Sequence, residues 1–556
     1  MKGIPIMIRT KLLTAITFAL TASLAFSAAA FSGGSGSAED PYKVSRTEDL
    51  TELATMSVKD SLEGVYFVQT GDIAVNGAIA AIASNAEYPF MGSYNGMDYK
   101  ISGADINLSG KSAGLFIYTD DAEIKNVHIS DASLTISEAS GGIVSRASGE
   151  TIIDGCRFEG EIVASADTFL GCNAGGIAGY INENVTVTDC YAAAELSLKK
   201  SPLVLYAGGI AGYNKGKISE CESTVDFNAV SDNYLIGLGG IVGENAGTLS
   251  GCETEGTVSG SISNDVAHLY IGGIAGHNNG GKIERALNKA KLSAAGYNEY
   301  PGYIGGIAGY NQNGDIEISS NNGSVGGNVN FAGGVTGINY ASSGVATVNE
   351  CLNIGEITVS TGVIGGLVGG NLATEKSENV STVSSSINLY ELTEGNGAVG
   401  LVQTDFVGVS TTKNLIVRNL TDKYATTMTD NELKAATGIN ALSSDAWVYP
   451  KDGFFPSLAV VKNLAKAEAI ATAVDSENSK VAFTVYNPGN ETNAVAVLSF
   501  FKEGRFTGAK LADINATKGY SVHTVSTDLA KAADSVKVTV VNNLSGFAPI
   551  TEADSY

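Results

Sequence analysis

The chain has 556 residues, and its 34 lysines and arginines against 58 aspartates and glutamates give a net charge of −24. A chain with this excess of negative charge lacks the basic surface that nucleic acids and anionic lipids require. We therefore expect neither as a partner. The 68 glycines, 9 prolines and 44% hydrophobic residues exclude a disordered or collagen-like chain, and with four histidines we expect no metal site and no cofactor.

The first thirty residues have the pattern of a secretory signal peptide, which is removed from the mature protein. Lys2, Arg9 and Lys11 precede an apolar stretch at 12–26, and three alanines ending at Ala30 supply the small residues of a cleavage site. The apolar stretch is shorter than the ~20 residues needed to span a bilayer. We therefore expect cleavage near Ala30, a secreted or cell-surface protein, and no transmembrane segment after cleavage.

Residues 31–62 are predicted to form an N-terminal cap. Ser45 and Glu48 have the spacing of a helix capping box, and Leu50, Leu53 and Ala54 follow at the spacing of a short amphipathic helix. Such a helix covers the open edge of the first strands, which would otherwise pair with other chains.

The segment 63–400 repeats itself. A glycine pair followed by an apolar residue recurs at intervals of 28 to 34 residues, with the pairs beginning at Gly141, Gly175, Gly208, Gly239, Gly272, Gly305, Gly333 and Gly365. Repeats of this length indicate stacked structural units. Each unit consists of short runs of alternating apolar and polar residues separated by Gly, Asn and Ser, which predicts strands and excludes helical repeats. The sequence thus predicts an all-β, right-handed parallel β-helix, with one coil per unit and coils about 4.8 Å apart.

An asparagine column follows the glycine pairs. It is expected to form a structural ladder of hydrogen bonds along the turns, and its members are Asn214, Asn245, Asn278, Asn311, Asn339 and Asn371.

A column of small residues contains most of the cysteines. It lies three positions after an apolar column (Ile153, Val187, Ile218, Leu249, Ile283, Ile316 and Val348), and its members are Cys156, Cys190, Cys221, Cys252, Ala286, Ser319 and Cys351. Because alanine and serine occupy the same position, unpaired buried cysteines fit it. Neighbouring coils are also close enough for a disulfide such as Cys221–Cys252, so both alternatives stay open.

The position before the ladder asparagine is aromatic in several coils: Tyr180, Tyr213, His277 and Tyr310. Such a stripe would bind a ligand by stacking sugar rings. The alternative is an aromatic ladder that only stabilises the turns, and the interruptions at Glu244, Ile338 and Gly370 favour it.

The repeats resemble the GLUG motif of bacterial cell-surface and secreted proteins. The residues that carry the resemblance are Gly-Gly-Ile-Ala-Gly-Tyr-Asn at 208–214 and again at 305–311. The resemblance implies a surface or secreted β-helix, often associated with adhesion. GLUG repeats also accompany IgA-cleaving metallopeptidases, but this chain has no His-Glu-x-x-His motif, so that activity is not carried over.

Residues 401–462 are predicted to close the C-terminal end of the β-helix. Thr429 and Glu432 form a second capping box, followed by Leu433 and a stop at Gly438, with Trp447 as a buried lid.

From residue 463 to 556 the glycine pairs are absent. Strands are expected at 481–486, 494–501, 520–525 and 536–541, joined by turns such as Asn487-Pro488-Gly489-Asn490. This pattern predicts a small Ig- or fibronectin-like β-sandwich.

The sequence offers no clear catalytic site. The carboxylate pairs Asp120/Asp121, Glu220/Glu222 and Glu253/Glu255 are adjacent or alternate in an acidic chain, which indicates a solvated surface. We therefore expect an exported, non-enzymatic rod that displays surface for adhesion to an extracellular glycan or a matrix or host protein. A carbohydrate-active β-helix enzyme and a purely structural spacer are the alternatives.

Overall fold

The computed structural model describes residues 31–541 except 107–111, 137, 165–170, 199–202, 232–233, 263–267, 297–301, 375, 377, 393–396, 403–408, 414, 419–421, 430–431, 434–441, 443–446, 449–456, 459–467, 476–478, 488–491, 503–504, 517–518 and 534. The predicted signal peptide and Gly438 lie outside the described residues, so cleavage near Ala30 stays a prediction.

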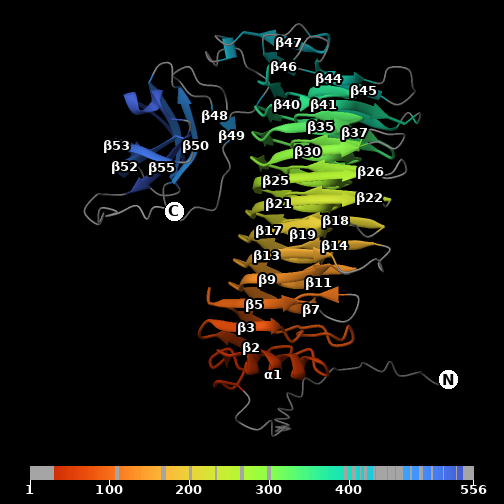
Figure 1. The fold of residues 1–556 in the computed structure, drawn as a ribbon, viewed down its shortest axis with the longest axis vertical. Coiled ribbons are helices and arrows are strands. Elements are labelled where there is room, and N and C mark those ends of the chain that lie inside the picture. The colour runs from red at the N-terminus through yellow and green to blue at the C-terminus, as the bar shows by residue number, and fades with distance from the viewer. Residues whose placement is uncertain are drawn as a thin grey trace, which may run out of the picture.

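The repeat region is a parallel β-helix, as predicted from the glycine pairs. Three long parallel sheets run the length of a rod, and each coil visits them in the order A, B, C before the chain climbs to the next coil. In Figure 1 the coil is right-handed, with sheets B and C toward the viewer and colours that change steadily from red to green.

Sheet A has one short strand per coil: β1 (Tyr42–Val44), β2 (Tyr66–Gln69), β4 (Ser93–Asn95), β8 (Glu123–Lys125), β12 (Ile152–Asp154), β16 (Thr186–Thr188), β20 (Lys217–Ser219), β24 (Thr248–Ser250), β28 (Lys282–Glu284), β33 (Asp315–Glu317), β38 (Val345–Asn349), β42 (Val380–Ser384) and β45 (Val409–Lys413).

Sheet B consists of β3 (Ile73–Ala78), β5 (Lys100–Ile106), β9 (His128–Ile136), β13 (Arg157–Ala164), β17 (Tyr191–Leu198), β21 (Glu222–Ser231), β25 (Glu253–Ile262), β29 (Leu287–Asn288), β30 (Lys291–Gly296), β34 (Ser320–Asn321), β35 (Val325–Val329), β39 (Leu352–Asn353), β40 (Ile357–Val359), β43 (Ile387–Asn388), β46 (Leu415–Arg418) and β47 (Ala425–Met428).

Sheet C receives two strands from most coils, and in these coils the glycine pair forms the bend between them. Its strands are β6 (Ser112–Ala113), β7 (Phe116–Asp120), β10 (Ala139–Gly141), β11 (Val144–Ser148), β14 (Cys172–Gly175), β15 (Ala178–Ile181), β18 (Val204–Gly208), β19 (Ala211–Asn214), β22 (Leu235–Gly239), β23 (Val242–Asn245), β26 (His268–Gly272), β27 (Ala275–Asn279), β31 (Gly302–Gly305), β32 (Ala308–Gln312), β36 (Phe331–Gly333), β37 (Thr336–Ala341), β41 (Val363–Ala373) and β44 (Gly397–Val402).

The core is a set of apolar columns inside the coils. The predicted column is in register from strand to strand and fully buried: Ile153, Val187, Ile218, Leu249, Ile283, Ile316 and Val348. One continuous cluster of buried side chains extends from Val44 to Val417. Burial of these side chains stabilises the rod, and the identical register in each coil keeps every apolar residue on the inner face.

The glycines of sheet C allow its two arms to pack closely. A β carbon on Gly243 of β23 would lie 2.4 Å from the backbone nitrogen of Ala207 in β18. Gly212, Gly276 and Gly309 occupy equivalent positions, each with a backbone nitrogen within 2.6 Å of the added carbon. The glycine before each aromatic position is therefore required by this close approach of two strands.

The predicted N-terminal helix is present as α1 (Thr47–Ser57), at the N-terminal end of the rod in Figure 1. Leu50, Leu53 and Ala54 are buried and belong to the core of the first coils.

The predicted capping box of Ser45 and Glu48 is wrong. Arg46 is the residue that precedes the helix, and it makes no side-chain cap. Asp49, one position beyond Glu48, accepts from the Ser45 backbone nitrogen at 2.9 Å and from Arg46 Nε at 3.1 Å. The buried Asp49 carboxylate thus accepts the backbone hydrogen bond that was expected for Glu48. The Arg46 guanidinium stabilises the charge of Asp49 in this position.

The second predicted capping box is confirmed. The Glu432 carboxylate accepts from the Thr429 backbone nitrogen at 2.8 Å and from its hydroxyl at 2.7 Å, and Thr429 Oγ1 accepts from the Glu432 nitrogen. Trp447 begins the short strand β48 (Trp447–Val448), which pairs with β49 (Ser457–Leu458). Its side chain is buried with Leu433 and Ile416 in a small separate cluster.

The C-terminal region consists of two three-stranded antiparallel sheets. They are formed by β50 (Glu468–Asp475), β51 (Lys480–Asn487) and β54 (Gly519–Ser526), and by β53 (Arg505–Ala516), β52 (Thr492–Lys502) and β55 (Ser535–Val541), with a short 3-10 helix, η1 (Asp528–Lys531). The four predicted strands are present, and β50 and β53 are additional. The sheets share one core cluster, whereas likeness to an Ig or fibronectin fold stays a prediction.

Candidate functional site

The predicted asparagine column forms a continuous chain of amide hydrogen bonds inside the rod. Each Nδ2 donates to the Oδ1 of the next coil, at 2.8, 2.8, 2.7, 2.7 and 2.9 Å from Asn214 through Asn245, Asn278, Asn311 and Asn339 to Asn371. The same amides also bond backbone carbonyls, as Asn278 Nδ2 does with Gly281 O at 2.9 Å. All six side chains are fully buried, so their role is structural and they are not exposed to a ligand.

A second asparagine ladder, which was not predicted from the sequence, lies on sheet B. Asn288, Asn321, Asn353 and Asn388 are linked by amide bonds of 2.7, 2.8 and 2.8 Å. The signal was an apolar or serine residue before asparagine at intervals of 32 to 35 residues. A β carbon on Gly273 would lie 2.1 Å from Asn288 Cγ, which explains the second glycine of the pair in this part of the rod.

All six cysteines are buried free thiols. In the predicted column, Cys190 Sγ donates to Thr188 O at 3.2 Å, and Cys156, Cys221, Cys252 and Cys351 make equivalent bonds. Burial raises the pKa of Cys351 to about 12, and Cys172, outside the column, behaves in the same way. The thiols of Cys351 and Cys172 are therefore poor nucleophiles.

The predicted aromatic positions form one column on the outer face of sheet C. Tyr180, Tyr213, Glu244, His277 and Tyr310 are paired in register. The rings of Tyr180 and Tyr213 stack at 4.9 Å and 6°, and those of His277 and Tyr310 stack with the same geometry. The stacked faces are turned toward one another, so a sugar would meet mainly ring edges and hydroxyl groups. Ligand binding here stays a prediction.

A second aromatic column lies beside the first, on the other arm of sheet C. It contains Tyr206, Tyr270, Tyr303 and Phe331, and the Tyr270 and Tyr303 rings lie 5.3 and 5.2 Å from that of Tyr310. The signal in the sequence was an aromatic residue seven positions before Tyr213, His277 and Tyr310. We call the two columns together the aromatic face.

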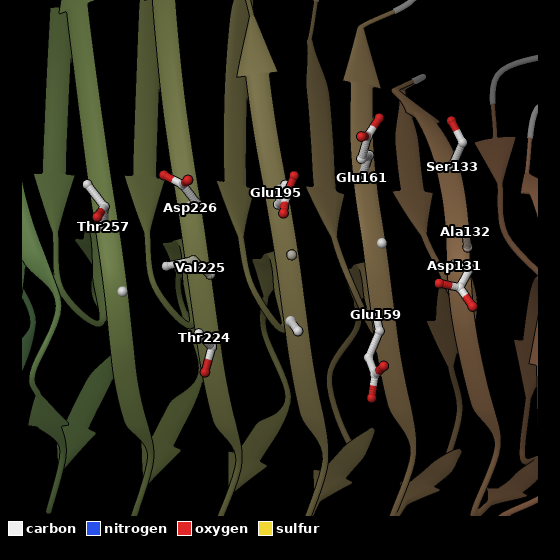
Figure 2. A pocket seen from close by; sticks show the side chains of 14 residues that line it. Asp131, Ala132, Ser133, Glu159, Glu161, Glu195, Thr224, Val225, Asp226 and Thr257 are labelled. Carbon is white, nitrogen blue, oxygen red and sulfur yellow. The ribbon is translucent and has the colours of Figure 1, made fainter. Parts of the chain in front are cut away.

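A groove runs along the outer face of sheet B (Figure 2). It has a volume of about 760 Å³ and crosses the strands β9, β13, β17, β21 and β25. Figure 2 shows one row with Glu161, Glu195 and Asp226 on neighbouring strands and a second row with Glu159 and Thr224. We name these rows the Glu161 rim, which Ser133 and Thr257 extend in register, and the Glu159 rim, which also includes Asp131.

The groove lies where the pairing of β9 and β13 is interrupted by a β-bulge. The register of β9 and β13 shifts between Phe158 and Gly160, and Asp131 has a positive φ of 51°. The floor is a row of small residues and backbone: Ala132, Gly160, Ala194, Val225 and Gly256. Gly256 has a φ of +99°, and an added β carbon would meet Val225 O at 2.1 Å, so a side chain here would disturb the floor.

The groove is acidic and has polar edges. Its lining residues include five carboxylates and no lysine or arginine. Thr224 Oγ1 accepts from the Tyr191 hydroxyl at 3.3 Å, and Glu159 lies 3.2 Å from His128 Nε2. Among the described residues, no three His, Cys, Asp or Glu side chains are arranged to hold a metal ion. The chemistry of the groove is that of hydrogen-bond acceptors for hydroxyl or ammonium groups.

The carboxylates named from the sequence lie elsewhere. Glu253 is bonded to Lys289 Nζ, and Asp121 accepts from the Glu150 backbone nitrogen at 2.7 Å. None of these pairs lines the groove. The better signal was acidic residues at the repeat spacing, as at Glu161, Glu195 and Asp226.

Comparison with known proteins identifies no family. The chain matches no protein-family model and no curated protein. Among solved structures it is similar to a mutant tailspike protein of E. coli bacteriophage HK620 in complex with a hexasaccharide, with 10% identity and a TM-score of 0.26, over 86% of this chain and 82% of that chain. This similarity is too low to assign a role to any residue. Within the described part of the chain, no helix has the length and apolar character to cross a bilayer.

Proposed function

We propose that the protein is an exported, non-enzymatic rod that binds an extended glycan along the groove of sheet B. The observation that supports this most directly is the groove itself, which is open, elongated and lined by carboxylates and hydroxyls on two rims. Export and adhesion rest on the predicted signal peptide and on the resemblance to GLUG proteins.

The shape of the groove suits a linear chain of sugars. Successive members of each rim are one coil apart, about 4.8 Å, so equivalent acceptors recur along the axis at a spacing close to one sugar unit. Hydrogen bonds from sugar hydroxyls to carboxylates are stronger than bonds between neutral groups. The absence of lysine and arginine from the lining disfavours anionic glycans.

We expect the double variant Glu195→Gln, Asp226→Asn to weaken glycan binding about tenfold or more, because it removes two charged acceptors from the middle of the Glu161 rim. Binding is measured by calorimetry with residues 31–556 against neutral and amino-sugar oligosaccharides selected on a glycan array. Glu183→Gln, which removes one charge from an exposed turn outside the groove, is the matched control and should bind as the wild type does.

Three other results would redirect the proposal. No binding to any oligosaccharide contradicts it and leaves the structural spacer. Loss of binding in Tyr213→Ala, Tyr310→Ala but not in the groove variant moves the site to the aromatic face. Release of new reducing ends from the bound glycan would show that the protein cleaves it and is a carbohydrate-active enzyme.

A further inference from the structure

The centre of the aromatic face holds a deeply buried histidine. His277 in β27 is 6% exposed, and neither ring nitrogen has a partner with good hydrogen-bond geometry, although the Gln312 side chain lies close enough to favour the protonated ring. Its ring stacks on Tyr310 at 4.9 Å and lies 5.4 Å from Tyr270 and 6.5 Å from Tyr206. Polar atoms this deeply buried normally have hydrogen-bond partners. A charge on the imidazole would be buried without a bonded partner, which is costly, so the site favours the neutral ring.

Directly beside it, one coil earlier, lies a buried carboxylate. Glu244 is 7% exposed and is the register partner of His277. Its Oε1 accepts from Asn279 Nδ2 at 2.9 Å and lies 3.9 Å from His277 Nδ1. Tyr206 also bonds the Glu244 carboxyl. The two ionisable groups are therefore close but not bonded to one another.

The other groups that face His277 offer it little compensation. They are Tyr206 from β18, Tyr270 from β26 and Tyr310 from β32, with His268 beyond Tyr270 at 6.1 Å. The Gln312 side chain from β32 favours the protonated ring, but its effect on the pKa of His277 is smaller than that of burial. Within this set, Glu244 is the only group that can carry a negative charge at acidic or neutral pH.

We propose that the Glu244–His277 pair makes the rod acid-sensitive at this point, and that β23 and β27 are the first strands of the β-helix to open when His277 takes up a proton. A cation at His277 would have to find a partner by turning away from Tyr310 or by drawing Glu244 from Asn279 and Tyr206. Either movement disturbs the packing between two coils, and a solenoid opens at its weakest interface.

The two groups act on stability in opposite directions. Burial lowers the pKa of His277 from 6.5 to about 4, so its contribution is complete above pH 6.5 and is lost as the pH falls toward 4. Burial raises the pKa of Glu244, so ionised Glu244 destabilises the fold near neutral pH and this effect disappears on acidification. The histidine alone lowers the folding constant by up to about 300-fold over its window.

The test compares His277→Tyr, His277→Gln and Glu244→Gln with the wild type between pH 7 and 4, using the whole chain. Tyrosine occupies this column at 180, 213 and 310, so the first variant fits the fold. We expect the melting temperature of both His277 variants to fall less with acid than that of the wild type, and that of Glu244→Gln to fall more. Hydrogen exchange at pH 4.5 should accelerate at β23 and β27 of the wild type before β14 and β15.

His128→Gln is the control, because this histidine faces the more exposed Glu159. It should follow the wild-type pH profile. Identical pH profiles for the wild type and both His277 variants would overturn the proposal. So would acid-induced exchange that begins uniformly along the rod, or that begins at other coils.

Discussion

Replacing Asn278 with alanine should lower the free energy of unfolding by about 3–5 kcal/mol. Asn278 lies in the middle of the first ladder, where it accepts from Asn245 and donates to Asn311 at 2.8 and 2.7 Å. Alanine removes both bonds and leaves Asn311 Oδ1 buried without this donor. It also leaves Gly281 O without its bond from Asn278. An unsatisfied buried polar group costs about 1–3 kcal/mol, so the losses add along the ladder.

Urea unfolding followed by circular dichroism checks this expectation. The control is Asn182→Ala, which makes the same change at an exposed asparagine of the coil that precedes the ladder, and it should change stability by less than about 1 kcal/mol. If both variants unfold at the same urea concentration as the wild type, the amide chain contributes little and the apolar columns alone hold the coils in register.

The sequence predicts the features of this rod that recur at constant positions. The glycine pairs, the first asparagine ladder and the apolar column repeat in nearly every coil, so their spacing shows the β-helix and its register. The second ladder is preceded by leucine, serine or isoleucine at 287, 320, 352 and 387 and occupies only later coils. Its residues therefore resemble ordinary turn asparagines until the strands are paired.

The groove was not predicted because its components are distant in the sequence and common in composition. Glu161, Glu195 and Asp226 stand among 58 acidic residues, and only the pairing of β13, β17 and β21 brings the three into one row. The strands β50 and β53 were missed for a different reason. In β50 alanine alternates with isoleucine, threonine and valine, so its two faces differ little in polarity, and β53 has only two β-branched residues in twelve.

The inside and outside of the coils therefore carry different information. Inside, the packing of neighbouring coils demands small or amide side chains at fixed positions, and the repeat is strict. On the outer faces of the strands the side chains vary more from coil to coil, and the acidic groove and the Glu244–His277 pair lie on these faces. Function in this rod is expected on the outer faces of the strands, either where acidic residues line up from coil to coil, as at Glu161, or where the column changes its residue type, as at Glu244.

Replacing Gly243 with alanine should destabilise the rod by more than about 4 kcal/mol, the range that marks a severe steric defect. The added β carbon would lie 2.4 Å from Ala207 N and 2.5 Å from Tyr206 C. These are backbone atoms of β18, which is held on both sides by β14 and β22, so they cannot move aside as a flexible side chain would. The two arms of sheet C would have to separate, which would also pull Tyr206 from the Glu244 carboxyl.

The matched control is Gly71→Ala, because no atom lies within 4 Å of the added carbon and the glycine does not have a positive φ. It should leave stability within about 1 kcal/mol of the wild type. Thermal melting and near-ultraviolet circular dichroism of the tyrosines measure both variants. A Gly243→Ala protein with wild-type melting would mean that the arms of sheet C separate at little cost. In that case the glycine before each aromatic position would need another explanation, and the aromatic face would be a looser surface than its ring geometry indicates.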